Sequence, residues 1–281
     1  MEQQNIIEQI HASYYQLTAA EKKVADYVCA HSEQIQFMSI TQLADECGVA
    51  DATVSRFCRS LQLKGFNAFK LELARHAAPN TSRQPESPEM DTLAGRSHEV
   101  GRLAQEAVQQ TLELLQPQQI AQAVSLMEKA PRVMCIGSGS SMIMAQECAY
   151  LFSMVTEKFF TVADTHWQNA TVASMDRNDI IILFSYSGAT TGGLKILELA
   201  KSRGISTVLV TRFSKSPAAK LADVVLRCGS NEGPYQLASV PAKIAQLVVV
   251  DVLFQEYCHR NQEACKKHRM QIAAALAEMH I

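Results

Sequence analysis

The sequence predicts an all-α domain followed by an α/β domain with a parallel, doubly wound sheet. Apolar residues recur at helical spacing through residues 5–75, whereas short apolar runs alternate with helical segments after residue 130. A proline-rich polar stretch separates the two patterns. Strands that alternate with helices at this rhythm form a parallel sheet with helices on both faces. We therefore place one domain at 1–77, a linker at 78–95 and a second domain at 96–281.

Composition narrows the class of protein. The 281 residues carry a formal net charge of −2 and an ordinary apolar content, which is typical of a folded, soluble chain. No apolar run approaches the length of a membrane span, and the N-terminus lacks the basic and apolar regions of a secretion signal. The eight cysteines are scattered without a CxxC pair, as in reduced proteins. We expect a cytoplasmic protein with no membrane attachment.

The first domain begins with helices expected at 5–15 and 18–30. Thr18 followed by Glu21 has the form of a capping box, which marks the second helix start. Two shorter helices follow. Ser39 or Thr41 can cap the first of them and Gly48 can end it. The second is expected at 51–61, with Asp51 as its cap.

These two short helices have the spacing of a helix-turn-helix. With Ile40 as position 1, Ala44 falls at position 5, Gly48 at position 9 and Val54 at position 15. Those positions need a close helix approach, a turn and a core contact. The second helix would then enter a major groove of double-stranded DNA.

Basic residues concentrate on this second helix and after it. Residues 51–76 hold five Lys or Arg (56, 59, 64, 70 and 75) against two acids (51 and 72). Such an edge suits contact with phosphates. The side chains that we assign to DNA binding are Thr53, Ser55, Arg56, Arg59 and Lys64. A helical protein-interaction module with a solvated charged face is the alternative.

The second domain follows a regular alternation. Helices are expected at 97–115, 117–129, 142–152, 167–175, 194–203, 239–257 and 262–280. Strands are expected at 133–136, 158–162, 180–184, 207–211 and 224–228. In such sheets ligands bind beyond the carboxyl ends of the strands.

Two of these carboxyl ends carry turns rich in glycine and hydroxyl groups. GSGSS at 137–141 follows one strand, and SYSGATTGG at 185–193 follows another, each leading into a helix. Free N–H groups at a helix N-terminus, helped by the helix dipole, hold an anion. The second turn therefore predicts a phosphate site, and a turn that merely caps its helix is the alternative. A dinucleotide site is disfavoured because GSGSS lacks the third glycine of GxGxxG, and the lysine of a P-loop is absent.

No cofactor or metal is expected. Only Cys258, His259, Cys265 and His268 resemble a ligand cluster, and their spacing matches no common zinc frame.

The chain resembles the RpiR-type bacterial transcription regulators, which join a helix-turn-helix domain to a sugar isomerase (SIS) domain. The resemblance rests on ATVSRFCRSLQLKGF at 52–66, GSGSS at 137–141, DTHWQ at 164–168, SYSGAT at 185–190 and AQLVVVDVLF at 245–254. It implies an SIS-type sheet and a homodimer or homotetramer built through that domain. It further implies a phosphosugar effector held by Ser185, Ser187 and Thr190, with Ser141 completing the site. We add Ser140, Gly188 and Glu232 to this set.

Three positions depart from the family pattern. Ala50 stands where serine is frequent, Ala189 where many members have glutamate, and Lys243 near a common arginine. These departures bear on sugar specificity.

Two further functions stay open beside a DNA-binding regulator of sugar metabolism genes. An aldose–ketose phosphosugar isomerase with an accessory helical domain needs a general base. Glu232 and His166 are its only candidates near strand ends. A helical adaptor that senses a sugar phosphate without DNA is the other. We favour the regulator over an enzyme.

Overall fold

The computed structural model describes residues 6–77, 92–230 and 239–277. The chain divides into two compact units, a helical one and one built around a sheet. Most of the linker expected at 78–95 lies outside the described residues, but its last residues already belong to helix α6, which begins at Leu93.

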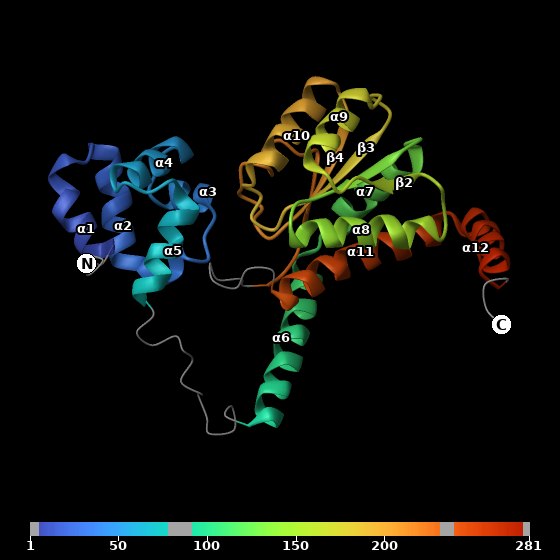
Figure 1. The fold of residues 1–281 in the computed structure, drawn as a ribbon, viewed down its shortest axis with the longest axis horizontal. Coiled ribbons are helices and arrows are strands. Elements are labelled where there is room, and N and C mark those ends of the chain that lie inside the picture. The colour runs from blue at the N-terminus through green and yellow to red at the C-terminus, as the bar shows by residue number, and fades with distance from the viewer. Residues whose placement is uncertain (1–5, 78–91, 231–238, 278–281) are drawn as a thin grey trace. The chain divides into compact units, whose positions relative to one another are not determined.

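The N-terminal unit is a bundle of short helices (Figure 1). Its elements are α1 (Ile6–Ser13), the 3-10 turn η1 (Tyr14–Gln16), α2 (Ala19–Ile35), α3 (Ile40–Glu46), α4 (Asp51–Ser60) and α5 (Phe66–Ala77). Val28, Leu43 and Phe57 are fully buried at the centre. Phe57 meets Phe69 of α5 edge to face at 5.5 Å, which joins α4 to α5.

Local sequence signals set most helix ends of this bundle. Thr18 caps α2 in a capping box with Glu21, and Ser39 caps α3 in a second one with Gln42. Gly48 takes the left-handed conformation (φ +63°) expected of it. The helix-turn-helix packing is also confirmed, because Ala44 and Val54 are fully buried.

The expected cap of α4 is wrong. Ala50 occupies the N-cap position and makes no side-chain cap bond. Asp51 is instead the first helical residue, and its carboxylate accepts a 2.8 Å hydrogen bond from Thr41 Oγ1 of α3. Asp51 thus ties the two helices of the motif together.

The second unit contains a five-stranded, all-parallel sheet in the order β2-β1-β3-β4-β5. The strands are β1 (Val133–Ile136), β2 (Phe159–Thr161), β3 (Ile180–Phe184), β4 (Ser206–Thr211) and β5 (Val224–Arg227). Both faces are buried. Val133 and Cys135 of β1 face one apolar cluster, and Met134 and Ile136 face the other.

Seven helices complete the described part of this half of the chain. They are α6 (Leu93–Leu114), α7 (Pro117–Lys129), α8 (Ser140–Ser153), α9 (Thr165–Ser174), α10 (Thr191–Ser202), α11 (Val240–Arg260) and α12 (Gln262–Ala277). Buried residues of α7, α8 and α11 share one cluster, and those of α9 and α10 share the other. The doubly wound α/β class is confirmed. No helix among the described residues is long and apolar enough to span a membrane.

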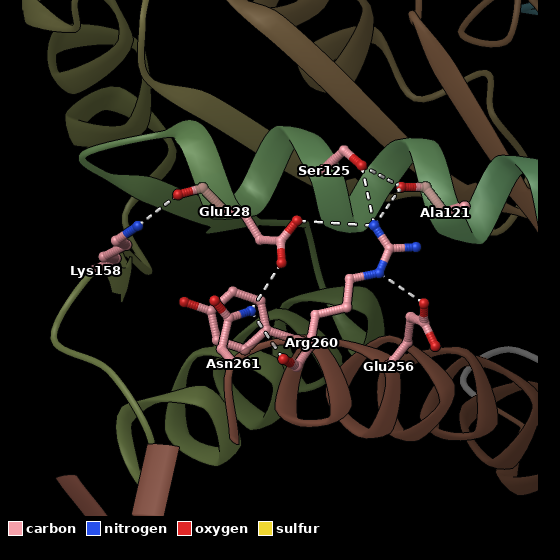
Figure 2. Close-up of polar contacts among 8 residues, drawn as sticks. Ala121, Ser125, Glu128, Lys158, Glu256, Arg260 and Asn261 are labelled. Carbon is pink, nitrogen blue, oxygen red and sulfur yellow. Dashed lines mark hydrogen bonds and ion pairs between the residues drawn. The ribbon is translucent and has the colours of Figure 1, made fainter. Parts of the chain in front are cut away.

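A polar network holds the last turn of α11 against α7 (Figure 2). Arg260 Nε bonds Glu256 at 2.7 Å, and its guanidinium lies 3.7 Å from the Glu128 carboxylate. Asn261 follows as the break between α11 and α12, and its Nδ2 donates to Glu128 at 2.9 Å. These bonds therefore fix the end of α11 and Asn261, from which α12 continues, against α7.

Candidate effector site and nucleic-acid surface

The two hydroxyl-rich turns lie side by side at the carboxyl edge of the sheet. Strand β1 pairs with β3, so the turn at 137–141 and the turn at 185–190 leave neighbouring strands. From β1 the chain first adds β2 on one side and then β3 on the other. In open α/β sheets a crevice for ligands forms where the strand order switches in this way.

The turn after β3 gathers three hydroxyl groups. The Ser185 hydroxyl is buried and lies 3.4 Å from Thr190 Oγ1. Ser187 Oγ accepts a 3.3 Å hydrogen bond from the Ala189 N–H. Thr190 is exposed at the N-cap of α10. The turn therefore presents donors beside a helix N-terminus.

Gly188 is required at the bend of this turn. Its φ is +60°, and a Cβ built there would overlap Ser216 Oγ. Its carbonyl accepts a 2.9 Å hydrogen bond from the Ala218 N–H. The residues after β4 thus fix the shape of the turn.

Helix caps distinguish the N-termini that meet at this edge. Asp164 caps α9 by accepting a 2.7 Å bond from the Trp167 N–H. Within the described part of the chain, the N-caps Gly139 of α8 and Thr190 of α10 make no side-chain cap bond. An anion at these two N-termini would take the role that a capping side chain has elsewhere.

Gln168 holds the first turn in place, a role that the sequence reasoning missed. Its side chain is 2% exposed, and Nε2 donates to the carbonyls of Gly137 at 3.2 Å and Val162 at 2.8 Å. The sequence could have indicated this role, because Gln168 is a polar residue four positions before Val172 and so lies on the same buried face of a short helix.

The remaining predicted effector residues are Ser140, Ser141 and Glu232. Ser141 is buried and Ser140 half-buried in the first turn of α8, two residues before the expected helix start. Glu232 lies outside the described residues.

The predicted DNA-binding residues differ in exposure. Arg56, Arg59 and Lys64 are exposed, and Ser55 is half-buried. The expectation that Thr53 faces outward is wrong, because it is 5% exposed and accepts a 3.2 Å hydrogen bond from Arg56 Nη2. The buried Thr53 therefore orients the exposed Arg56 side chain through this hydrogen bond.

Two other basic residues of this region bind within their own domain. Lys70 Nζ donates to the Met38 carbonyl at 3.3 Å and lies 5.4 Å from the Phe66 ring centre. Arg75 pairs with Glu72 at 3.3 Å. The basic side chains that we keep as candidates for DNA contact are therefore Arg56, Arg59 and Lys64, which lie on α4 and just after it.

This fold and these sites define a class, the helix-turn-helix transcriptional regulators with a SIS domain. Residues 4–80 match the helix-turn-helix domain of the rpiR family, and residues 126–255 match the SIS domain. The chain belongs to the RpiR family of transcriptional regulators.

Similar proteins support this assignment along the whole length. The HTH-type transcriptional regulator YbbH of Bacillus subtilis is 31% identical, with 97% of each chain covered. A regulator of Haemophilus influenzae is 28% identical, with 99% of this chain and 98% of its own covered. The solved structure of Vibrio vulnificus NanR complexed with ManNAc-6P has a TM-score of 0.89 at 25% identity, over 99% of this chain and 100% of that one.

Proposed function

We propose that this regulator binds a sugar phosphate in the crevice between the two turns and that the bound sugar changes its affinity for DNA. The observation that carries the proposal is the pair of helix N-termini without side-chain caps, α8 and α10, at neighbouring strand ends with hydroxyl donors. The likeness to a regulator solved with ManNAc-6P agrees with it.

The phosphate would lie against the N-terminus of α10, where Ser185, Ser187 and Thr190 can donate hydrogen bonds to it. Gly188 lets the backbone turn there. Ser140 and Ser141, in the first turn of α8, would line the side of the crevice that follows β1. Glu232 stays a proposed contact to the sugar.

DNA binding is assigned to α4. Its N-terminal half would enter the major groove, with Arg56, Arg59 and Ser55 near base edges and Lys64 near a phosphate. Thr53 acts through Arg56. A homodimer or homotetramer built through the SIS domain, in the cytoplasm, would present two such helices to two half-sites of an operator.

We propose binding without turnover. Isomerisation needs a general base beside the reacting carbons. Of its two candidates, His166 is exposed in the first turn of α9 and Glu232 lies outside the described residues. No described residue thus favours the isomerase over a sensor.

Binding to DNA from upstream of the protein's own and neighbouring genes tests the proposal. The titration is repeated over a range of salt and with a panel of sugar phosphates that includes ManNAc-6P. Sequence-selective, salt-sensitive binding that shifts with one sugar phosphate is expected. No selective binding under any condition would contradict the regulator, and the same panel would then be assayed for turnover.

Ser187→Ala should lower the affinity for the sugar phosphate severalfold, because it removes a hydroxyl from the turn, and should leave the DNA affinity without sugar unchanged. Calorimetry of sugar binding and a DNA titration measure the two effects. Ser202→Ala at the far end of α10 is the matched control. Equal sugar affinity in the two variants would remove Ser187 from the site.

A further inference from the structure

The joint between α11 and α12 brings two thiols and a cation together. Cys258 lies in the last turn of α11 and Cys265 in the first turn of α12, seven positions apart and on either side of the break at Asn261. Both line a cavity of about 380 Å³, together with Arg269. Cys258 is half-buried, and Cys265 is 3% exposed.

The surroundings hold this arrangement in place. The Arg260 and Asn261 contacts with Glu128 fix the end of α11 (Figure 2). The Cys265 N–H donates to the Asn261 carbonyl at 2.9 Å, which places Cys265 directly after the break. Among the described residues of α12, Cys265 is the only buried one.

Arg269 gives Cys258 a charged partner. Its Nη2 donates to Cys258 Sγ at 3.4 Å, and its guanidinium lies 5.5 Å from the Phe254 ring centre, which orients it. Reactive cysteines typically are partly exposed and lie beside a cation, as Cys258 does. Cys265 differs, because burial and the neighbouring Cys258 raise the pKa of its thiol to about 11. Cys258 is thus the accessible sulfur beside a cation, and Cys265 is the buried one.

The two histidines near these cysteines in the sequence do not join them in space. His259 is exposed in a separate groove, and His268 Nδ1 lies 3.9 Å from Glu157. No group of three or more His, Cys, Asp or Glu among the described residues is placed to hold a metal ion.

We propose that Cys258 and Cys265 are a peroxide-sensitive thiol pair that closes to a disulfide. The Cys258 sulfur attacks one oxygen of a hydroperoxide, the O–O bond breaks, and Cys258 becomes a sulfenic acid as the other oxygen leaves as water or an alcohol. The Cys265 sulfur then gives up its proton and attacks the Cys258 sulfur, the S–O bond breaks, and the departing hydroxide takes up a proton and leaves as water. Both sulfurs are oxidised, and the peroxide is reduced. The bond would attach α12 covalently to α11.

Reaction of the full-length reduced protein with hydrogen peroxide tests the pair, with alkylation and peptide mass mapping over time. A Cys258–Cys265 linked peptide lighter by two hydrogen atoms is expected. Cys265→Ser should instead accumulate a sulfenic acid that dimedone traps at Cys258. If both cysteines stay alkylatable in the wild-type protein, or if Cys258 joins another cysteine, the proposal is overturned.

Two comparisons isolate the cation. Cys29 is another half-buried cysteine, in the helical unit, and burial together with the neighbouring Asp26 raises the pKa of its thiol. It should oxidise severalfold more slowly than Cys258 in the same sample. Arg269→Met keeps the length of the side chain and should slow the oxidation of Cys258 severalfold. Equal rates at Cys258 and Cys29, or an unchanged rate in the variant, would overturn the assigned role of Arg269.

Discussion

At Gly188 the backbone and the packing both require glycine. Gly188→Ala would force an alanine into φ +60° and push its Cβ onto Ser216. Strain in such a region amounts to about 1–3 kcal/mol, so we expect a loss of stability of that order in denaturant unfolding. The affinity for the sugar phosphate should fall with it, because the turn that carries Ser187 must move.

Gly192 provides the matched control. It lies in the first turn of α10, its φ is ordinary, and a Cβ there meets nothing within 4 Å. Gly192→Ala should therefore keep or raise stability, by up to about 1 kcal/mol. If both variants behave alike, the close contact with Ser216 does not shape the turn.

Glu21 links the stability of the helical unit to pH. The Thr18 hydroxyl donates to its carboxylate at 2.7 Å, and Ser60 of α4 donates at 3.1 Å. The hydrogen bonds from Thr18, opposed by burial, hold the pKa of Glu21 below its usual value. A carboxyl group with a lowered folded-state pKa stabilises the fold above its unfolded pKa, about 4.3, and this stability is lost as pH falls through the folded pKa.

Glu21→Gln measures that contribution. The variant should be less stable than the wild-type chain at pH 7, by about 1–3 kcal/mol, and the difference should shrink as pH falls below about 4. Urea unfolding of both chains across this pH range is the measurement. Glu8→Gln, at an exposed position of α1, is the control. A difference that does not depend on pH would show that the charge of Glu21 is not involved.

Residue roles set by chain neighbours could be predicted from the sequence, and those set by distant contacts could not. Thr18 and Gly48 act on the ends of their own helices, so their positions along the sequence were enough to predict their roles. Asp51 accepts a hydrogen bond from Thr41 on another helix, and the Thr53 side chain is buried inside the helical unit. Gln168 serves a turn that precedes it by about 30 residues. Such roles depend on tertiary contacts that helical periodicity does not contain.

At the scale of elements, the proposal that this protein binds DNA depends on helix α4. Arg59→Ala should weaken operator binding, because Arg59 is exposed on α4 within residues 51–76, where basic residues outnumber acids. If Arg59 reads a guanine, the loss is about 1–3 kcal/mol and confined to the operator. A binding titration against operator and unrelated DNA separates these cases. Lys23→Ala, at an exposed position of α2, should bind as the wild-type chain does. Unchanged binding in Arg59→Ala and Arg56→Ala would assign DNA to another face.

Element boundaries were predicted best where burial is continuous. The run Ile180–Phe184 is buried at every position, and the expected strand matches β3. Helices α8 and α10 begin two and three residues before their expected starts, at Ser140 and Thr191. Their first turns hold Ser, Thr and Gly, which give no apolar periodicity. Ser140 and Ser141 in the first turn of α8, and Thr190 just before α10, are among the residues assigned to the sugar phosphate.

At the scale of the whole molecule, the sequence predicts the alternation of strands and helices but not their neighbours. Both hydroxyl turns were expected at carboxyl ends. The two turns are adjacent because β1 lies beside β3 in the strand order β2-β1-β3-β4-β5, and this order is known only from the structure. Strand order follows from how helices pack on each face, and a single sequence does not encode that in its periodicity.

Coupling between the two sites gives the last prediction. If a sugar phosphate changes operator affinity by some factor, the operator must change the affinity for that sugar phosphate by the same factor. Calorimetry of sugar binding, with and without saturating operator, should reproduce the factor from DNA titrations with and without saturating sugar. Ser187→Ala should move the shift to severalfold higher sugar concentrations and keep DNA binding, whereas Arg59→Ala should keep sugar affinity. Operator binding that shifts while sugar affinity does not would mean that the sugar acts at a different assembly of the protein, and not through one linked pair of sites.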